Sequence, residues 1–258
     1  MLFELSHAFE DAMPHHPMVP PFQHFLARRL GDVVRPGGVS VASDVLVAPL
    51  HVGTHIDAFS HVADAHELAR ERADGIAVER PAGETLAPLL TRAVVLDCRA
   101  AVDGGAHEIG PDVLADAGDR NDALPGAGDV ALVATGWDRH WGDPEAYAGA
   151  QADPPGLSVD GARWLADRGV VAVGADTPAL EPASTRLGVH RLLLEERRVH
   201  IIENLHLTGL LDAGEHDVLF LALPLRIVGA TASPLRCVAV TGDGIAACRA
   251  ALRAAVAG

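Results

Sequence analysis

The sequence predicts an α/β protein with a mixed sheet, and two observations carry this prediction. Short apolar runs of strand length recur along the 258 residues, each flanked by Gly, Pro or Asp. Segments with helix start and stop signals lie between these runs. This alternation favours a sheet with helices packed against it. No long segment rich in Pro, Gly and Ser separates the runs, so we expect a single domain over residues 1–258.

Six of the apolar runs are predicted strands because each is short and rich in aliphatic residues. In chain order they span residues 93–96, 130–134, 170–173, 200–202, 218–223 and 237–240. Ahead of them, apolar residues alternate with period two over residues 39–47. That period is typical of a strand, and we expect this strand to lead from a sheet into the segment that begins at His51.

Four segments are predicted helices, namely residues 111–117, 158–168, 188–198 and 244–256. In the second of these, Ser158 is placed as the N-cap and Gly169 ends the helix. The proline-rich stretch at residues 13–22 cannot form regular ladders and is expected to be an irregular surface segment. Such segments often cover pockets, although a plain surface loop is at least as common.

Charge and composition exclude several classes of partner. The formal net charge is −15 and all 20 basic residues are arginines, so neither a nucleic acid nor an anionic membrane is expected to bind. No run of 18 apolar residues occurs, and the first residues lack the pattern of a signal peptide, which favours a cytoplasmic protein. The three cysteines, Cys98, Cys237 and Cys248, are far apart and are expected to be reduced.

The most informative segment is His-Val-Gly-Thr-His-Ile-Asp-Ala-Phe-Ser-His, residues 51–61. It places His51, His55, Asp57 and His61 within eleven residues, and imidazole with carboxylate is a ligand set that suits Zn²⁺, Mn²⁺ or Fe²⁺. Gly53 permits a tight bend, so we expect a loop that folds its side chains around one point. The alternative is a chance cluster in a chain with 14 histidines.

A second segment carries two further candidate ligands. His190 opens the predicted helix at 188–198, and Glu203 ends the predicted strand that follows it. A helix that returns through a strand can bring both ends to one edge of a sheet, where α/β proteins usually place ligands. By itself this pattern is weak, because a single helical histidine and a strand-end glutamate are more often structural or solvated.

Together these residues resemble the cyclase-type metal-dependent hydrolases, the family of bacterial kynurenine formamidase and isatin hydrolase. The resemblance rests on His-Val-Gly-Thr-His-Ile-Asp-Ala-x-x-His, followed by His190 and by Ile-Ile-Glu-Asn-Leu at 201–205. It extends over most of the chain through Thr135-Gly-Trp, Gly174-Ala-Asp-Thr-Pro and Leu223-Pro-Leu. It implies a swivelling β/β/α fold and a homo-oligomer, either a dimer or a tetramer.

The resemblance also implies a role for each residue. His51, His55 and Asp57 would bind one metal ion and His190 a second, with Asp57 and Glu203 touching both. His61 would be the acid/base. Two divalent ions would lower the pKa of a water between them toward neutrality, and His61 titrates in the range needed to move a proton to a departing nitrogen. Zn²⁺ is the first expectation for the metal and Mn²⁺ the second.

Two departures from the family pattern concern the substrate. Phe59 stands where the motif usually has proline, and the tryptophan that formamidases place near residues 20–22 is missing, so Phe22 is the candidate for its role. The interval from His190 to Glu203 is one residue longer than is typical of the family.

Asp176 has two possible roles. It either orients a ligand histidine by a hydrogen bond to the ring nitrogen that does not bind the metal, or it caps the turn at Thr177-Pro178.

The predicted function is hydrolysis of a small-molecule amide, N-formyl group, or cyclic imide or lactam by a metal-activated hydroxide. A lactone or ester hydrolase, or an enzyme acting on a polyketide-like ring, is the alternative within enzymology, because the same hydroxide attacks an ester. A metal-binding protein without turnover is the alternative from another class. The presence of His61 argues against it, because a purely structural site needs no acid/base.

Overall fold

The structure is a computed structural model that describes residues 1–17, 19–63, 81–242 and 245. Most of the helix predicted at 244–256, together with Cys248, lies outside these residues. Within them, a nine-stranded sheet has the order β1-β13-β11-β5-β7-β9-β10-β4-β12. The strands are β1 (Leu2–Glu4), β4 (His55–Asp57), β5 (Leu89–Asp97), β7 (Val130–Ala134), β9 (Ala172–Ala175), β10 (His200–Glu203), β11 (Asp217–Ala222), β12 (Ala232–Pro234) and β13 (Cys237–Val240).

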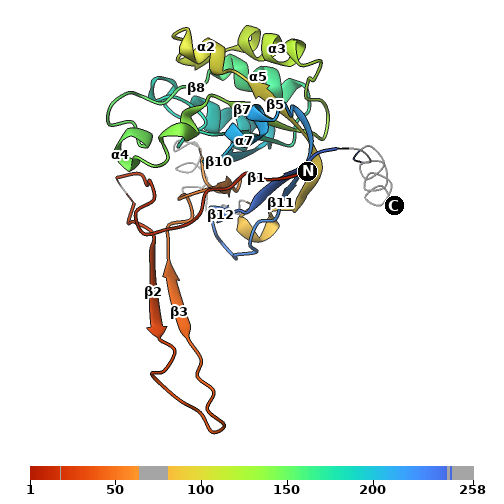
Figure 1. Cartoon of the computed structure of the whole chain (residues 1–258). Helices are drawn as coiled ribbons and strands as arrows, with labels where there is room; N and C mark the ends of the chain where they lie inside the picture. The colour runs from red at the N-terminus through yellow and green to blue at the C-terminus, as the bar shows by residue number, and fades with distance from the viewer. Residues whose placement is uncertain (18, 64–80, 243–244, 246–258) are drawn as a thin grey trace, which may run out of the picture.

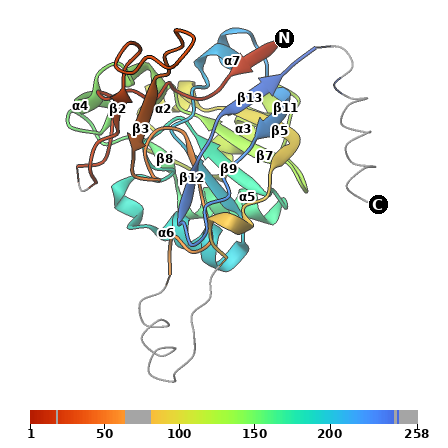
Figure 2. The same ribbon diagram turned by 90° about the horizontal axis from the view of Figure 1, so that it is seen from below.

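The sheet is mixed, as predicted. Strands β5, β7, β9 and β10 pair in parallel, while β11, β13, β1, β4 and β12 are joined by antiparallel pairings. The six predicted strands all occur, with ends that differ by a few residues. The N-terminus lies beside β13 and β11 at one end of the sheet in both views (Figures 1 and 2). The α/β class with a mixed sheet is therefore confirmed.

The remaining strands form two small two-stranded sheets, β2 (Gln23–Arg28) with β3 (Ser43–Val47) and β6 (Glu108–Ile109) with β8 (Gly156–Leu157). The helices are α2 (Arg99–Asp103), α3 (Pro111–Arg120), α4 (Pro144–Tyr147), α5 (Val159–Asp167), α6 (Gly188–His190) and α7 (Thr208–Asp212). Short 3-10 turns are η1 (Gly83–Thr85), η2 (Trp137–His140) and η3 (Ala183–Thr185). Among the described residues, no helix has the length and apolar character needed to span a membrane.

Local chemistry explains where the helices begin. The Ser158 hydroxyl accepts a hydrogen bond from the Gly161 amide at 3.0 Å, so Ser158 is the N-cap of α5 as predicted. Helix α3 begins at Pro111, a position where the missing N–H of proline costs no intrahelical bond. Gly169 follows α5 with φ of 82°, which is a left-handed conformation that ends a helix.

The segment predicted as one helix at 188–198 is a helix of two kinds. It begins as a turn of α-helix, α6, and continues as a π-helix, η4 (Arg191–Arg197). A π-helix holds more residues in each turn than an α-helix and often marks a functional site. This π-helix lies within the interval from His190 to Glu203 that is one residue longer than is typical of the family.

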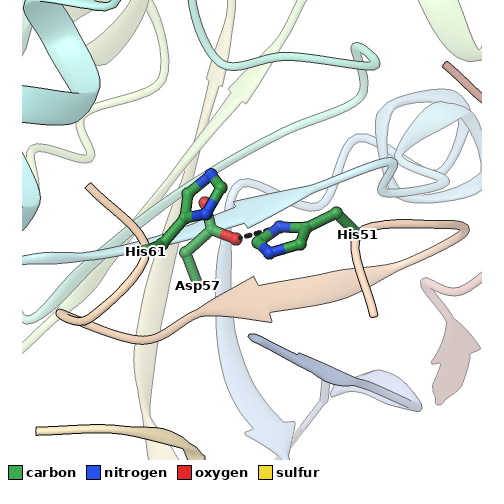
Figure 3. Close-up of side chains that lie close together, drawn as sticks. All are labelled: His51, Asp57 and His61. Atoms are coloured by element: carbon green, nitrogen blue, oxygen red, sulfur yellow. Dashed lines mark ion pairs between the residues drawn. The ribbon is translucent and has the colours of Figure 1, made fainter. Parts of the chain in front are cut away.

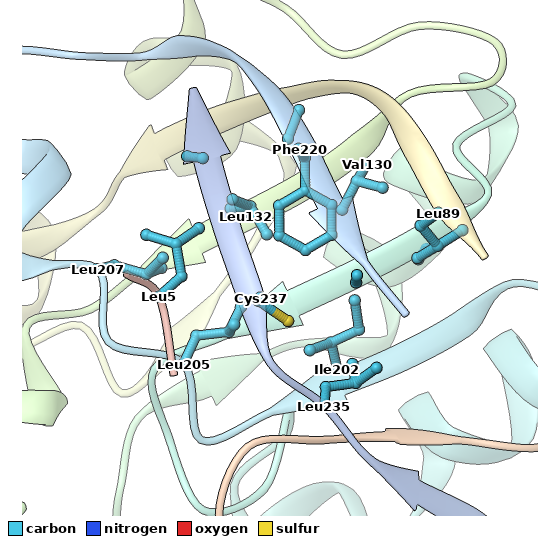
Figure 4. Close-up of a cluster of buried hydrophobic side chains, with 14 of the residues drawn as sticks. Leu5, Leu89, Val130, Leu132, Ile202, Leu205, Leu207, Phe220, Leu235 and Cys237 are labelled. Carbon is cyan, nitrogen blue, oxygen red and sulfur yellow. The ribbon is translucent and has the colours of Figure 1, made fainter. Parts of the chain in front are cut away.

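The core lies on both faces of the sheet. On one face, alternate residues of β5, β7 and β9 pack with buried side chains of α3, α5 and η4. On the other face the sheet curls around a second cluster, in which Phe220, Leu132, Ile202 and Cys237 from four different strands meet (Figure 4). Cys98 and Cys237 are free and buried, in agreement with the reduced state expected for them.

The strand predicted over residues 39–47 forms only at Ser43–Val47, and it does not belong to the large sheet as expected. It pairs antiparallel with β2 in a hairpin that projects away from the rest of the molecule (Figure 1). Every residue of both strands is exposed. The alternating pattern identified a strand correctly, but it carried no information about which strand would be its partner.

Candidate metal centre

The predicted metal-binding segment is partly a loop and partly a strand. Residues 51–54 form the expected loop, but His55–Asp57 is strand β4, paired with β10 on one side and β12 on the other. Successive side chains of a strand point to opposite faces, so His55 and Asp57 share one face. Because the register sets Glu203 opposite His55, a third candidate ligand joins them.

Gly53 shapes the loop that precedes this strand. Its φ of 60° is left-handed, and a Cβ at this position would lie 2.4 Å from the Phe9 ring. The Gly53 carbonyl accepts a hydrogen bond from Nδ1 of His55 at 2.8 Å. This bond places the proton on Nδ1 and leaves the lone pair of Nε2 directed into the site.

The side chains of the first segment converge on Asp57, which is fully buried (Figure 3). Oδ1 of Asp57 lies 2.9 Å from Nδ1 of His51 and 3.6 Å from Nε2 of His55. On its other ring nitrogen, His51 contacts the hydroxyl of Thr231 at 3.0 Å. The ring of His61 lies 4.0 Å from that of His51, centroid to centroid.

The distant segment does reach the same place. Nε2 of His190 lies 3.2 Å from Oε1 of Glu203 and 3.9 Å from Oδ2 of Asp57. Nε2 of His55 lies 3.4 Å from Oε2 of Glu203. The six residues expected to form the centre are therefore brought together by two loops, two strands and one helix.

Glu181 is a site residue that the sequence analysis missed. Its Oε1 accepts hydrogen bonds from Nδ1 of His190 at 2.5 Å and from the His190 backbone amide at 2.8 Å. A carboxylate in this place fixes the ring orientation and leaves Nε2 free for a ligand. Glu181 lies nine residues before His190 across the irregular turn η3, and no motif links the two residues in sequence.

Burial and charge shift the ionisation of these groups in opposite directions. Burial alone would lower the pKa of His190, but hydrogen bonds to Glu181 and Glu203 outweigh it and raise the pKa to about 10. The pKa of His55 is likewise raised, because Glu203 and Asp57 outweigh its burial. The pKa of Glu203 lies far below its ordinary value despite burial, because the imidazoles of His190 and His55 lie beside its carboxylate. The centre therefore favours a cationic charge in its midst.

Three buried polar atoms support binding of a metal ion. Within the described residues, Nε2 of His55 and both side-chain oxygens of Asp57 accept or donate no hydrogen bond. Leaving such atoms buried without a partner costs on the order of 1–3 kcal/mol each. Imidazole nitrogens and carboxylate oxygens are ligands for a divalent cation. The residues present thus fit the divalent metal predicted from the sequence.

The geometry groups the candidate ligands differently from the family pattern. Ligand atoms within 4.8 Å of one another form two sets that share Asp57, one with His51 and His61 and the other with His55 and Glu203. Burial lowers the pKa of His61. A neutral His61 beside Asp57 has the position of a ligand as well as that of an acid/base, so its role stays a prediction.

The other three predicted site residues lie farther from the centre. Phe22 is buried in a small cluster with Met13 and Val52. Phe59 stacks on His200 with ring centroids 4.1 Å apart. Neither lines the cavity described below, and substrate contact by Phe22 or Phe59 stays a prediction.

Asp176 makes hydrogen bonds that favour a structural role. Its carboxylate accepts from the amides of Thr135 and Gly136 and from the Thr135 hydroxyl, at 2.6 to 3.0 Å. Its backbone carbonyl accepts from the Tyr147 hydroxyl. Asp176 therefore ties β7 to β9, and among the interactions described no ligand histidine is bound to it.

A cavity of about 330 Å³ opens beside the centre. His51, Glu181 and Asn204 line its inner side, while Pro14 and Pro17 from the proline-rich segment form part of its wall. The proline-rich segment at residues 13–22 therefore borders a pocket and is not a plain surface loop. Most of the remaining lining is apolar, including Val52, Tyr147 and Pro178. Such a space suits a small molecule with a polar end near the ligands.

Sequence comparison relates the chain to proteins of similar motif. Residues 3–182 match the Cyclase family, described as putative cyclase. A kynurenine formamidase of Bordetella petrii is 45% identical over 76 residues, which are 29% of this chain and 34% of that protein. The chain therefore matches about a third of the length of the kynurenine formamidases to which it is similar.

Structural comparison extends the likeness to nearly the whole chain. A crystal structure described as a novel cyclase superimposes with a TM-score of 0.80 at 24% identity, covering 93% of this chain and 87% of that one. Isatin hydrolase A from Ralstonia solanacearum gives a TM-score of 0.75 at 22% identity, covering 93% and 91%. At these identities the likeness shows a shared fold, which is the fold that the sequence resemblance implied.

Proposed function

Because this chain belongs to the putative cyclase family, we propose that it is a metal-dependent hydrolase that cleaves a C–N bond. The proposed substrates are small molecules that carry an amide, an N-formyl group, or a cyclic imide or lactam. Proteins of similar sequence or fold include kynurenine formamidase and isatin hydrolase. A homo-oligomer, either a dimer or a tetramer, belongs to the same proposal.

The observation that carries the proposal is a group of buried ligand atoms without hydrogen bonds, next to a cavity that His51 lines. Nε2 of His55 and the oxygens of Asp57 are buried without hydrogen bonds, and His51 lines the cavity itself. We propose that His51, His55, Asp57, His190 and Glu203 hold two divalent ions, Zn²⁺ in the first place and Mn²⁺ in the second. When bound, such ions polarise a carbonyl and lower the pKa of water.

The residues of this chain divide the remaining work. Gly53 and Glu181 fix the tautomers of His55 and His190, so that each keeps a free nitrogen for a ligand. Burial lowers the pKa of His61, which keeps its imidazole neutral at pH 7 and able to accept a proton. In the proposed reaction His61 takes a proton from the attacking water and gives it to the leaving nitrogen. The apolar cavity wall excludes bulk water from the substrate.

A product assay tests this proposal. The metal-loaded protein is incubated with N-formylkynurenine, isatin and a simple lactone, and formate, amine or ring-opened product is measured. We expect C–N cleavage by the native chain and a loss of at least 100-fold in kcat for His61→Ala, with metal content unchanged. The matched control is His140→Ala, a histidine of η2 outside the site.

Two outcomes would contradict the proposal. Hydrolysis of the lactone alone would make the protein an ester-type enzyme. Loss of the metal together with activity in His61→Ala would make His61 a ligand, and the acid/base role would then be wrong.

A further inference from the structure

Asn204 is a strained residue on the wall of the cavity, and the reaction proposed above gives it no role. It directly follows the candidate ligand Glu203 and is only 6% exposed. Its φ of 57° lies in the left-handed region, which asparagine tolerates better than most residues with a Cβ. Strained backbone of this kind persists only where the surroundings hold it, and it gathers at functional sites.

The surroundings of Asn204 hold its backbone on both sides. Its amide donates to the carbonyl of Thr177 at 3.1 Å, and its carbonyl accepts from the hydroxyl of Thr54 at 2.6 Å. Thr54 precedes the candidate ligand His55, so the predicted metal-binding segment itself anchors Asn204. Because both backbone groups are paired with protein groups, the side-chain amide is the part of Asn204 that can serve a bound molecule.

Tyr147 orients that amide. Its hydroxyl lies 3.0 Å from Oδ1 of Asn204 and 3.2 Å from the backbone carbonyl of Asp176. Both of these oxygens are acceptors, so the one proton of the hydroxyl lies between them. Burial raises the pKa of Tyr147 well above its ordinary value, and the phenol therefore keeps this proton. With Oδ1 directed to the phenol, Nδ2 forms the opposite branch of the amide.

Nδ2 of Asn204 is a donor without a partner. Within the described residues it makes no hydrogen bond, and it is not among the buried atoms that lack one. Since Asn204 lines the cavity, Nδ2 is reached from there. Most of the cavity lining is apolar, and a polar group in such a space typically fixes the orientation of a bound molecule. His51 and Glu181 line the same cavity, which places this donor beside the candidate centre.

We propose that Nδ2 of Asn204 donates a hydrogen bond to the oxygen of the substrate carbonyl group that is hydrolysed. The proposal rests on the proposed function. When water adds to the carbonyl carbon, the electron pair of the C=O bond moves to the oxygen, and a donor already in place stabilises this charge. The amide keeps its proton throughout. When the C=O bond forms again, the C–N bond breaks, and the nitrogen takes up the electron pair and the proton that His61 is proposed to deliver.

Kinetics of two Asn204 variants test the proposal, with whichever amide substrate the native full chain hydrolyses. Asn204→Gly keeps the left-handed backbone and removes the amide, whereas Asn204→Asp keeps the shape and replaces the donor by an acceptor. Both are expected to lose about 100-fold or more in kcat, with KM changed by less than about threefold. Asp122→Gly, an exposed residue with φ of 49°, is the matched control and is expected to keep full activity. Bound metal and thermal unfolding are measured for every variant and are expected to match the native chain.

Tyr147→Phe tests the orienting role of the phenol. Its removal is expected to lower kcat about tenfold in the native background and to cause no further loss in Asn204→Gly, because it acts through the amide. Equal losses in both backgrounds would show that Tyr147 contributes only to the fold.

The results for Asn204 separate this proposal from the one it rests on. Native kcat in either Asn204 variant, or a loss confined to KM, would overturn the hydrogen bond to the reacting oxygen and leave the hydrolysis intact. Loss of bound metal from Asn204→Gly would overturn it as well, because Asn204 would then support the centre instead of the substrate. Absence of turnover in the native chain with every substrate would refute the proposed function, and this proposal with it.

Discussion

Glu181 accepts hydrogen bonds from both the ring Nδ1 and the backbone amide of His190, and we expect the metal affinity of the proposed centre to depend on it. Replacing Glu181 by Gln removes the charge that holds the Nδ1 proton of His190. We expect the affinity for divalent ions to fall about 10- to 100-fold, as is usual for a lost carboxylate behind a histidine ligand. Competition with a chelator of known affinity measures this change. Glu196→Gln, on the exposed side of η4, is the control, and equal affinities in both variants would refute the role.

His7 gives the fold a predictable acid sensitivity. It stacks on Trp141 at 3.8 Å, and burial lowers its pKa from 6.5 to about 4, with His206 contributing. Between these values the unfolded chain binds a proton that the folded chain does not. His7 therefore contributes stability that is fully present above pH 6.5 and is lost as the pH falls toward 4.

The variant His7→Gln isolates this contribution. The advantage of the native chain over the variant in free energy of unfolding is expected to shrink by on the order of 2 kcal/mol between pH 7 and pH 4.5. Urea unfolding at the two values measures it. A difference between the two proteins that stays constant with pH would show that His7 does not titrate in this way.

The four candidate ligands of residues 51–61 could be found from the sequence because they lie within eleven positions and belong to one motif. Glu181 and Thr231 could not. Each contacts a candidate ligand histidine through a fold that brings distant turns together, and a glutamate in a turn or a threonine before a strand is ordinary in any sequence. The contacts of Asp176 were equally hidden, because both of its possible roles begin from the same turn residues.

At the scale of elements, the loop at Gly53 precedes strand β4, which carries the candidate ligands His55 and Asp57. In Gly53→Ala the new Cβ would lie 2.4 Å from the Phe9 ring, in a left-handed backbone. Gly214→Ala is a matched control, since its φ of 70° is similar but no atom lies within 4 Å of the new Cβ. We expect the control to lose about 1 kcal/mol of stability and Gly53→Ala to lose at least 2 kcal/mol more. Thermal unfolding compares the two, and equal losses would mean that the contact with Phe9 carries no cost.

The six predicted strands could be identified because short aliphatic runs bounded by Gly, Pro or Asp rarely form any other buried element. The π-helix at Arg191–Arg197 was not predictable, since its buried run at residues 192–194 is equally compatible with an α-helix. The hairpin was half predictable. The alternation of apolar residues identified β3. The exposure of the β2–β3 hairpin, however, depends on β2 and on the direction in which both strands leave the rest of the molecule.

At the scale of the whole molecule, the fold brings three acidic side chains and four histidines together near one end of a curled sheet with a hydrophobic core on both faces. β4 joins the sheet next to β10, and this neighbouring position unites the motif at residues 51–61 with Glu203. A centre of this kind couples metal binding to folding, because the unfolded chain holds no preformed site. Metal is expected to stabilise the native chain by about 2.7 kcal/mol at a free concentration of 100 times its Kd.

The central claim is that these residues hold a divalent ion without which no hydrolysis occurs. Its most direct test is to strip the purified protein with a chelator and then titrate it with Zn²⁺ or Mn²⁺ while measuring both bound metal and hydrolysis of an N-formyl substrate. Activity is expected to be absent in the stripped protein, to rise with bound metal, and to stay absent in Asp57→Asn. Full activity of the stripped protein, or failure of the native chain to bind either ion, would contradict the account.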